Sequence, residues 1–189
     1  MKTYNCWTDG SCQKSKSGEP VGGWASIIVD ESGNITKLFQ GYKNTSNNRM
    51  EIMAVLETLK HFKEKSIINI VSDSMYVVNT INQGWAKKWF DEKDYSKQNL
   101  DLWFELLDLL DFHKVTISWT KGHSNNEMNN LADELAQFAA KCLNLPKDEY
   151  FNNRKESGES LVSESEARWS DWFGVEQQDG KITYSFGHR

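Results

Sequence analysis

Four acidic residues lie where predicted strands and helices would bring carboxylates together. Asp9 ends the first predicted strand, Glu51 lies in the first turn of a predicted helix, and Asp73 ends a buried strand. Asp133 lies inside the last predicted helix. Each acid alone has an ordinary explanation, since Asp is frequent in turns. Four carboxylates around one sheet edge would nevertheless repel one another unless cations neutralised them.

The chemistry of this acidic set predicts a magnesium site. Glu51 is either an ordinary first-turn acid, which the helix dipole favours, or a ligand for a cation at the edge of the core. Oxygen-only ligands suit Mg²⁺, with Mn²⁺ as a substitute, and the sequence has no His/Cys cluster that would favour zinc. We therefore expect a divalent hard cation here.

Size, charge and cysteine content limit the possible classes of protein. The 189 residues suit one domain of about 140 residues plus an extension. The net charge of -5 does not indicate a nucleic-acid binder, so a polyanionic partner would need a local basic patch or metal ions. Three cysteines favour reduced thiols, and no stretch is long enough to span a membrane. We expect a cytoplasmic protein without a membrane partner.

Hydrophobic periodicity predicts an α/β fold with the order β-β-β-α-β-α-α-β-α. An antiparallel meander followed by alternating helices and strands predicts a five-stranded mixed sheet with helices on its faces. The predicted strands are residues 4–8, 22–29, 35–42, 67–71 and 115–119, and the predicted helices are residues 48–62, 76–81, 100–110 and 126–143.

The composition changes at Asn144-Leu145-Pro146, which predicts a domain of residues 1–143 and an extension of residues 144–189. The extension is predicted to contain a linker, a short Trp-rich helix at 168–173 and a hairpin at Asp179-Gly180. Its aromatic side chains are costly to leave in water, so we expect them to dock on the first domain, a second copy or another protein. The first domain alone is expected to carry the chemistry.

Four motifs resemble those of the type 1 ribonuclease H family, and they occur in the family's order over about residues 3–142. They are Thr8-Asp9-Gly10-Ser11-Cys12, Asn47-Asn48-Arg49-Met50-Glu51, Ser72-Asp73-Ser74, and Trp119-Thr120-Lys121-Gly122-His123 followed by Asp133-Glu134-Leu135-Ala136.

The resemblance implies an endoribonuclease that hydrolyses the RNA strand of RNA–DNA hybrids and leaves 3′-hydroxyl and 5′-phosphate ends. Asp9 would bridge two Mg²⁺ ions, and Glu51, Asp73 and Asp133 would complete the ligand set with the substrate bound. His123 is either an incidental loop residue or, as in the family, a proton shuttle that helps product release.

The resemblance also assigns substrate contacts, which must distinguish 2′-hydroxyls from their absence. Asn47 and Asn48 would reach the minor groove, although such amides also cap helices. Backbone groups near Cys12 would contact RNA, and Ser46 would bind a DNA phosphate. Met75 stands where the family often has Gln, so the amide that would bind RNA there is missing or replaced.

Residues 82–99 match a protrusion, called the handle, that is strongly basic in many relatives. Here four lysines against three acids leave a net charge of +1. The cluster that can contact the nucleic-acid backbone is Trp85, Lys87, Lys88 and Trp89, whose aromatic rings we expect to be partly exposed. Because counterion release scales with the number of phosphates neutralised, we expect a shallow salt dependence.

Two other interpretations compete with an active, free-standing enzyme. A catalytically inactive hybrid-binding module would lack carboxylates, whereas all four acids are present. A domain cut from a reverse transcriptase is disfavoured because Met1 stands immediately before the first predicted strand. We expect a monomeric enzyme.

Overall fold

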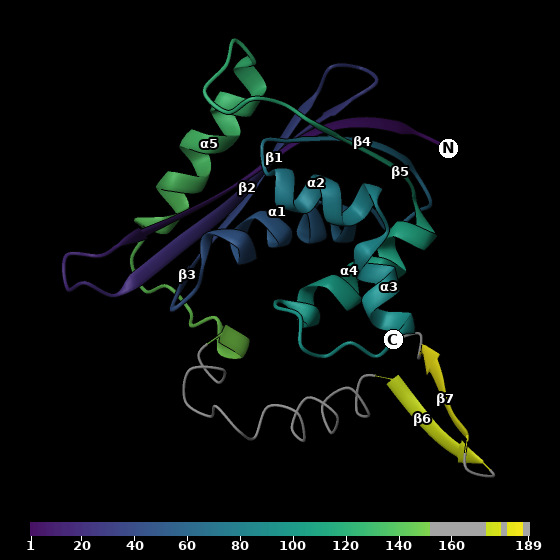
Figure 1. Ribbon diagram of the computed structural model, residues 1–189. Coiled ribbons are helices and arrows are strands. Elements are labelled where there is room, and N and C mark those ends of the chain that lie inside the picture. The colour runs from purple at the N-terminus through teal and green to yellow at the C-terminus, as the bar shows by residue number, and fades with distance from the viewer. Residues whose placement is uncertain (152–172, 179–180, 187–189) are drawn as a thin grey trace. The chain divides into compact units, whose positions relative to one another are not determined.

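The computed structural model describes residues 1–151, 173–178 and 181–186. The chain forms two compact units, residues 1–152 and residues 153–189. Among the described residues, no helix is long and apolar enough to cross a membrane. The first unit is built on a five-stranded sheet with the strand order β3-β2-β1-β4-β5 (Figure 1).

The sheet combines an antiparallel meander with two parallel strands, as predicted. Strands β1 (Thr3–Lys14), β2 (Pro20–Asp30) and β3 (Ile35–Lys43) form the meander. Strands β4 (Ile67–Ser72) and β5 (Lys114–Trp119) run parallel to β1. This arrangement confirms the predicted α/β fold.

Strand β1 is longer than predicted, which changes the setting of Asp9. Asp9 pairs with Ala25 of β2, so on that side the strand continues to Lys14. On the other side the ladder between β1 and β4 ends at the pair Thr8–Ser72. Asp9 therefore lies inside β1, one residue beyond the last pairing with β4, and is not at the strand's end.

Within residues 1–141, five helices accompany the sheet, one more than predicted. They are α1 (Asn47–His61), α2 (Met75–Asn82), α3 (Trp85–Asp91), α4 (Leu100–Phe112) and α5 (Glu127–Ala140). The unpredicted helix is α3, which has seven residues, three of them charged. Periodicity could not reveal it because two turns are too short to show an apolar stripe.

Helix α5 covers one face of the sheet, and α1 covers the opposite face (Figure 1). The buried residues of α5 are Asn129 and four alanines, Ala132, Ala136, Ala139 and Ala140, while Phe138 is 58% exposed. A side chain at Gly23 of β2 would lie 2.2 Å from the Ala136 carbonyl oxygen. Small residues on both partners therefore let α5 lie unusually close to the sheet.

The first unit extends past Leu143, where the sequence predicts its boundary. Lys147 forms a parallel bridge with Lys43 at the end of β3, and the Lys43 amide donates to the Pro146 carbonyl at 2.8 Å. Asp148 is buried. The sequence did not predict these backbone contacts because they are long-range and because the polar composition of the segment is typical of a linker.

In the second unit, β6 (Phe173–Gln178) and β7 (Lys181–Phe186) pair antiparallel, as the predicted hairpin requires. The predicted Trp-rich helix lies almost entirely outside the described residues, and Phe173, its last residue, begins β6.

Candidate active site

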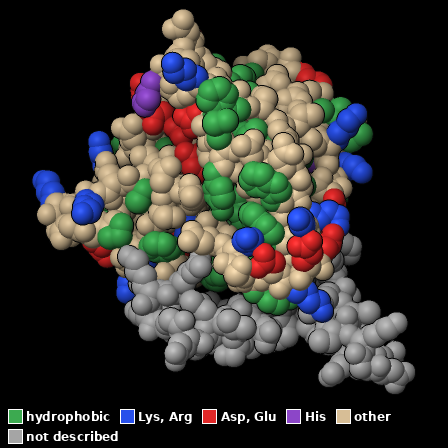
Figure 2. Space-filling model, viewed as in Figure 1, with side chains coloured by type: hydrophobic (Ala, Val, Ile, Leu, Met, Phe, Trp, Pro, Cys, Tyr) green, Lys and Arg blue, Asp and Glu red, His purple; other side chains and the backbone are tan. Residues whose placement is uncertain are grey.

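Three of the four predicted carboxylates converge in the structure. Asp9, Glu51 and Asp73 each offer one oxygen atom, and these oxygens all lie within 4.8 Å of one another. The residues come from β1, from α1 and from the turn after β4. Acidic side chains gather on this face of the molecule, and hydrophobic side chains lie directly beside them (Figure 2).

Close packing of α1 on β1 brings Glu51 to Asp9. A side chain at Gly10 would lie 2.3 Å from the Glu51 backbone nitrogen, so only glycine permits this approach. Helix α1 begins at Asn47 with Ser46 as its N-cap, so Glu51 is its fifth residue and lies just past the first turn, whereas the sequence predicts it within that turn. The helix dipole acts mainly on the first turn. It therefore does not account for this acid, which is only 5% exposed.

Burial and mutual repulsion make these carboxyl groups hard to ionise. Burial raises the pKa of Asp9 to about 8, with further contributions from the charges of Asp73 and Asp133. Burial and the neighbouring Asp9 raise the pKa of Glu51 well above its usual range. The pKa of Asp73 is also raised, again mainly by burial. A cation at this point would stabilise the ionised forms.

Asp133 and His123 lie beside the three converging acids. Asp133, on α5, is close enough for its charge to raise the pKa values of Asp9 and Asp73. Its carboxylate accepts hydrogen bonds from Gln137 Nε2 at 3.0 Å and lies 3.7 Å from His123 Nδ1. His123 has a left-handed backbone (φ 51°) and a side chain that is 84% exposed.

The donor set fits a hard divalent cation. The converging atoms are all carboxylate oxygens, which Mg²⁺ prefers. The Glu51 Oε2 atom is buried and makes no hydrogen bond to the described residues. A buried carboxylate oxygen without a partner is costly, and coordination of a cation would remove that cost.

Two residues around Asp73 were underestimated from the sequence. Asn129 is fully buried and makes no well-formed side-chain hydrogen bond among the described residues, yet its amide lowers the pKa of Asp73 against the effect of burial. Trp119 donates its indole N–H to the Asp73 carbonyl at 2.9 Å. One of the four motifs contains Trp119 but indicates no role for it, and Asn129 lies outside the motifs.

The residues predicted to contact the minor groove and the backbone of the hybrid lie around the start of α1. Asn47 and Asn48 are exposed, and the helix cap is Ser46, whose hydroxyl accepts the Arg49 amide at 3.3 Å. Cys12 is half-buried, with its sulfur 3.8 Å from the Thr45 carbonyl oxygen. The thiol thus connects β1 to the turn that immediately precedes α1.

The predicted handle residues are accessible to a ligand. Trp85 is 41% exposed and Trp89 is half-buried, which matches the predicted partial exposure. Lys87 and Lys88 are exposed; Lys87 pairs with Asp91 at 2.7 Å, and Lys88 pairs with Glu92, the C-cap of α3, at 3.9 Å. The exposed Met75 stands separately, at the start of α2.

Comparison with known proteins gives the family. The RNase H family model matches residues 1–141. The chain belongs to the ribonuclease H family. The ribonuclease H of Desulforamulus reducens is 41% identical over 153 residues, covering 78% of this chain and 94% of that protein. The ribonuclease H of Chlorobaculum parvum is 44% identical over 147 residues, covering 74% and 97%.

A solved structure of a type 1 enzyme, LC9-RNase H1, is similar in fold, with a TM-score of 0.63 and 26% identity. The match covers 74% of this chain and 72% of that one. The resemblance inferred from the motifs is therefore confirmed, and this ribonuclease H is an enzyme of the RNase HI type.

The raised pKa values predict that the metal-free ribonuclease H loses stability as pH rises from 7 to 9. Folded Asp9, with a pKa of about 8, holds a proton there that the unfolded chain does not, so stability falls with pH. The expected loss is on the order of 1 kcal/mol. Burial lowers the pKa of His113. A group with a lowered pKa gives its full contribution to stability above the pKa that it has in the unfolded chain, so His113 does not oppose the loss of stability between pH 7 and pH 9. Thermal unfolding in chelator at several pH values measures this loss of stability.

Two controls accompany that measurement. Asp9→Asn should reduce the slope, and about 10 mM Mg²⁺ should raise the melting temperature most at the highest pH, because binding to the folded state stabilises it. A melting temperature that rises between pH 7 and pH 9 in chelator would contradict the assignment of a protonated acidic cluster.

Proposed function

We propose that this ribonuclease H hydrolyses the RNA strand of RNA–DNA hybrids at the carboxylate cluster. The observation that carries the proposal is the convergence of Asp9, Glu51 and Asp73 within 4.8 Å, from three separate elements. Clustered buried acids with raised pKa values are characteristic of sites that handle cations or protons. Relatives that are 41% and 44% identical are named ribonuclease H.

Asp9, Glu51 and Asp73, together with Asp133, would hold two Mg²⁺ ions. When bound, such ions supply an activated water nucleophile and stabilise the leaving oxygen. Attack of water on phosphorus with loss of the 3′ oxygen leaves a 5′-phosphate and a 3′-hydroxyl. His123 is exposed and lies near Asp133, so its ring can carry a proton between solvent and the reacting oxygen.

The start of α1 would recognise the hybrid. Asn47 and Asn48 present amides that both donate and accept hydrogen bonds, as minor-groove edges and 2′-hydroxyls require. The Ser46 hydroxyl accepts a helix amide and can still donate to a phosphate oxygen. The backbone near Cys12 borders the same surface through its contact with Thr45.

One gel assay tests this proposal. Labelled RNA is offered as a hybrid with DNA, as double-stranded RNA and as a single strand, each with Mg²⁺, Mn²⁺ or chelator. We expect cleavage of the hybrid alone, only with metal, and a mobility that corresponds to 3′-hydroxyl and 5′-phosphate ends. Binding of the hybrid without cleavage would instead identify an inactive binding module.

The handle lysines are expected to contribute to hybrid binding and not to the chemical step. Replacing both (Lys87→Gln with Lys88→Gln) should raise KM several-fold and leave kcat nearly unchanged, because distant contacts bind ground and transition states alike. The slope of log KM against log salt should become shallower by about 1 for each phosphate that is no longer neutralised. Gln is preferred to Glu because Glu would repel Asp91 and Glu92 one turn away.

The matched control removes the acids that pair with these lysines. Asp91→Asn with Glu92→Gln should lower KM, because the lysines then face the phosphate backbone without internal competitors. Steady-state kinetics at several salt concentrations measures both pairs. An unchanged KM in both would show that the handle does not touch the substrate.

A further inference from the structure

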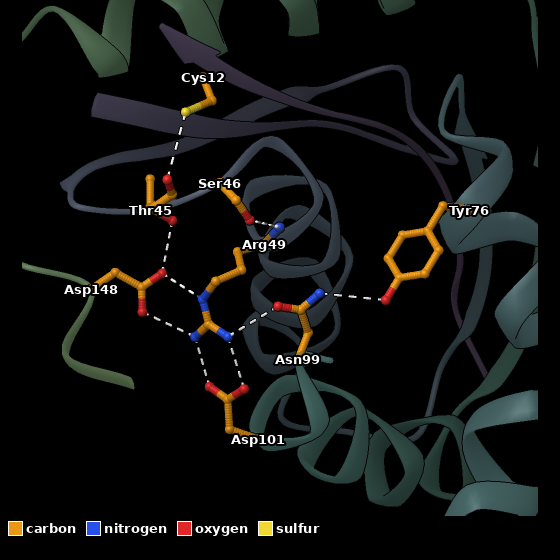
Figure 3. A network of polar contacts seen from close by, with 8 residues as sticks. All are labelled: Cys12, Thr45, Ser46, Arg49, Tyr76, Asn99, Asp101 and Asp148. Atoms are coloured by element: carbon orange, nitrogen blue, oxygen red, sulfur yellow. Dashed lines mark hydrogen bonds and ion pairs between the residues drawn. The ribbon is translucent and has the colours of Figure 1, made fainter. Parts of the chain in front are cut away.

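The Arg49 side chain extends into a polar network with Asp148, Asp101 and Asn99 (Figure 3). The two residues before it, Asn47 and Asn48, are exposed. Only 1% of its surface is accessible, although it follows these two residues directly in α1. A cation so close to a predicted phosphate-binding surface would ordinarily be expected to face the nucleic acid. Its burial therefore calls for another role.

Every N–H of the Arg49 guanidinium has an acceptor. Nε donates to Asp148 Oδ2 at 2.6 Å, and Nη2 donates to Asp148 Oδ1 at 3.0 Å and to Asp101 Oδ2 at 2.7 Å. Nη1 donates to Asp101 Oδ1 at 2.9 Å and to Asn99 Oδ1 at 3.4 Å. The Tyr150 ring lies over the guanidinium, 5.0 Å from its carbon. Four of the five donors form two planar forks with the carboxylates of Asp148 and Asp101, and the fifth reaches Asn99, so the network has a single geometry.

This network joins three chain segments that are far apart in sequence. Asp148 and Tyr150 belong to residues 144–151, the part of the first unit that follows α5. Asn99 and Asp101 lie where the handle ends and α4 begins. The Thr45 hydroxyl, in the turn before α1, donates to Asp148 Oδ2 at 2.7 Å.

We propose that Arg49 and Asp148 are positioning residues for hybrid binding, which makes residues 144–151 part of the substrate platform. This inference rests on the proposed function. The network sets the distance between the start of α1, which carries Asn47 and Asn48, and the handle, the two surfaces predicted to hold the duplex.

A purely stabilising role would be a weak explanation of the network. Buried ion pairs often contribute little net stability compared with well-packed apolar residues, since desolvation offsets their attraction. Their definite effect is on geometry, because a fork of directional bonds permits one arrangement. Two binding surfaces that must match one rigid duplex require that kind of restraint.

The primary test uses Asp148→Asn in the full chain, which keeps the side-chain shape and removes one charged acceptor. We expect KM for the hybrid to rise by at least about threefold with kcat within about twofold of wild type, as loss of uniform binding requires. Arg49→Lys should act in the same direction, because an ammonium cannot form both forks. Thr45→Val removes only the hydroxyl donor to Asp148, and it tests the proposal should either charged variant fail to fold.

Ile68→Ala is the matched control for lost stability. Ile68 is fully buried in β4, five residues before Asp73, and its truncation creates a cavity without touching the network. All kinetics are measured well below the lowest melting temperature. An unchanged KM in Asp148→Asn, or an equal rise in Ile68→Ala, would overturn the proposal.

A binding measurement separates this inference from the proposed function. Hybrid affinity is measured for Asp9→Asn with and without Asp148→Asn, so that cleavage plays no part. If wild-type enzyme does not cleave the hybrid, the proposed function fails, whatever the affinities. If wild type cleaves and Asp148→Asn binds as tightly as its parent, only the positioning role fails. In a background of Asn47→Ala with Asn48→Ala, the effect of Asp148→Asn should shrink.

Discussion

Asp9→Asn is expected to lower kcat for hybrid cleavage by more than about a thousandfold, or about 4 kcal/mol of transition-state stabilisation. Asp9 lies at the centre of the cluster, and its pKa is perturbed by both Asp73 and Asp133. The amide keeps the shape of the side chain but loses the negative charge that would hold a cation. Single-turnover cleavage with saturating enzyme measures the chemical step directly.

The same variant should retain the fold and bind hybrid, and in chelator it should be more stable than wild type at pH 8. Removing one of several repelling buried acids relieves an electrostatic cost. Glu64→Gln, which neutralises an exposed acid, is the control for the change in net charge. Cleavage by Asp9→Asn within tenfold of wild type would contradict the assignment of Asp9 as a metal ligand.

Truncation after Leu143 is expected to destabilise the first unit by about 3–5 kcal/mol, the cost typical of removing one partner of a buried ion pair. The truncation removes Asp148 and leaves Arg49 buried without the carboxylate that accepts from its Nε and Nη2. It also removes the Pro146 carbonyl that accepts from Lys43. Sequence composition predicts an intact first domain at this boundary, and this truncation tests that expectation.

Truncation after Asn152 is the matched comparison, because it keeps the whole network and removes only the second unit. Urea unfolding of both truncated chains and of the full chain gives the free energies of unfolding. Asp148→Asn in the full chain, which weakens the network without shortening the protein, should fall between the two truncations. Equal unfolding midpoints for the two truncations would show that residues 144–152 do not stabilise the first unit.

The sequence by itself determined the family, the strand order of the meander and the acidic residues of the candidate site. The alternation of apolar residues is local, so strands β2 to β5 and helices α1, α2, α4 and α5 could be predicted to within a few residues. Motifs in a fixed order carried the resemblance to ribonuclease H, which the family match over residues 1–141 confirms.

Tertiary structure alone decided how closely those acids converge and what surrounds them. Asp73 lies near Asp9 because the pairing of β1 with β4 ends at Thr8 and Ser72, one residue before each of these acids. Glu51 reaches them because Gly10 lets α1 pack closely against β1. Both causes are contacts between residues far apart in sequence. The partners of Arg49 are 52 and 99 residues away along the chain. No local pattern marks such a partner, because a carboxylate in a polar segment has the same neighbours in sequence whether it is buried or exposed. Only the folded chain, by excluding water from it, makes the difference.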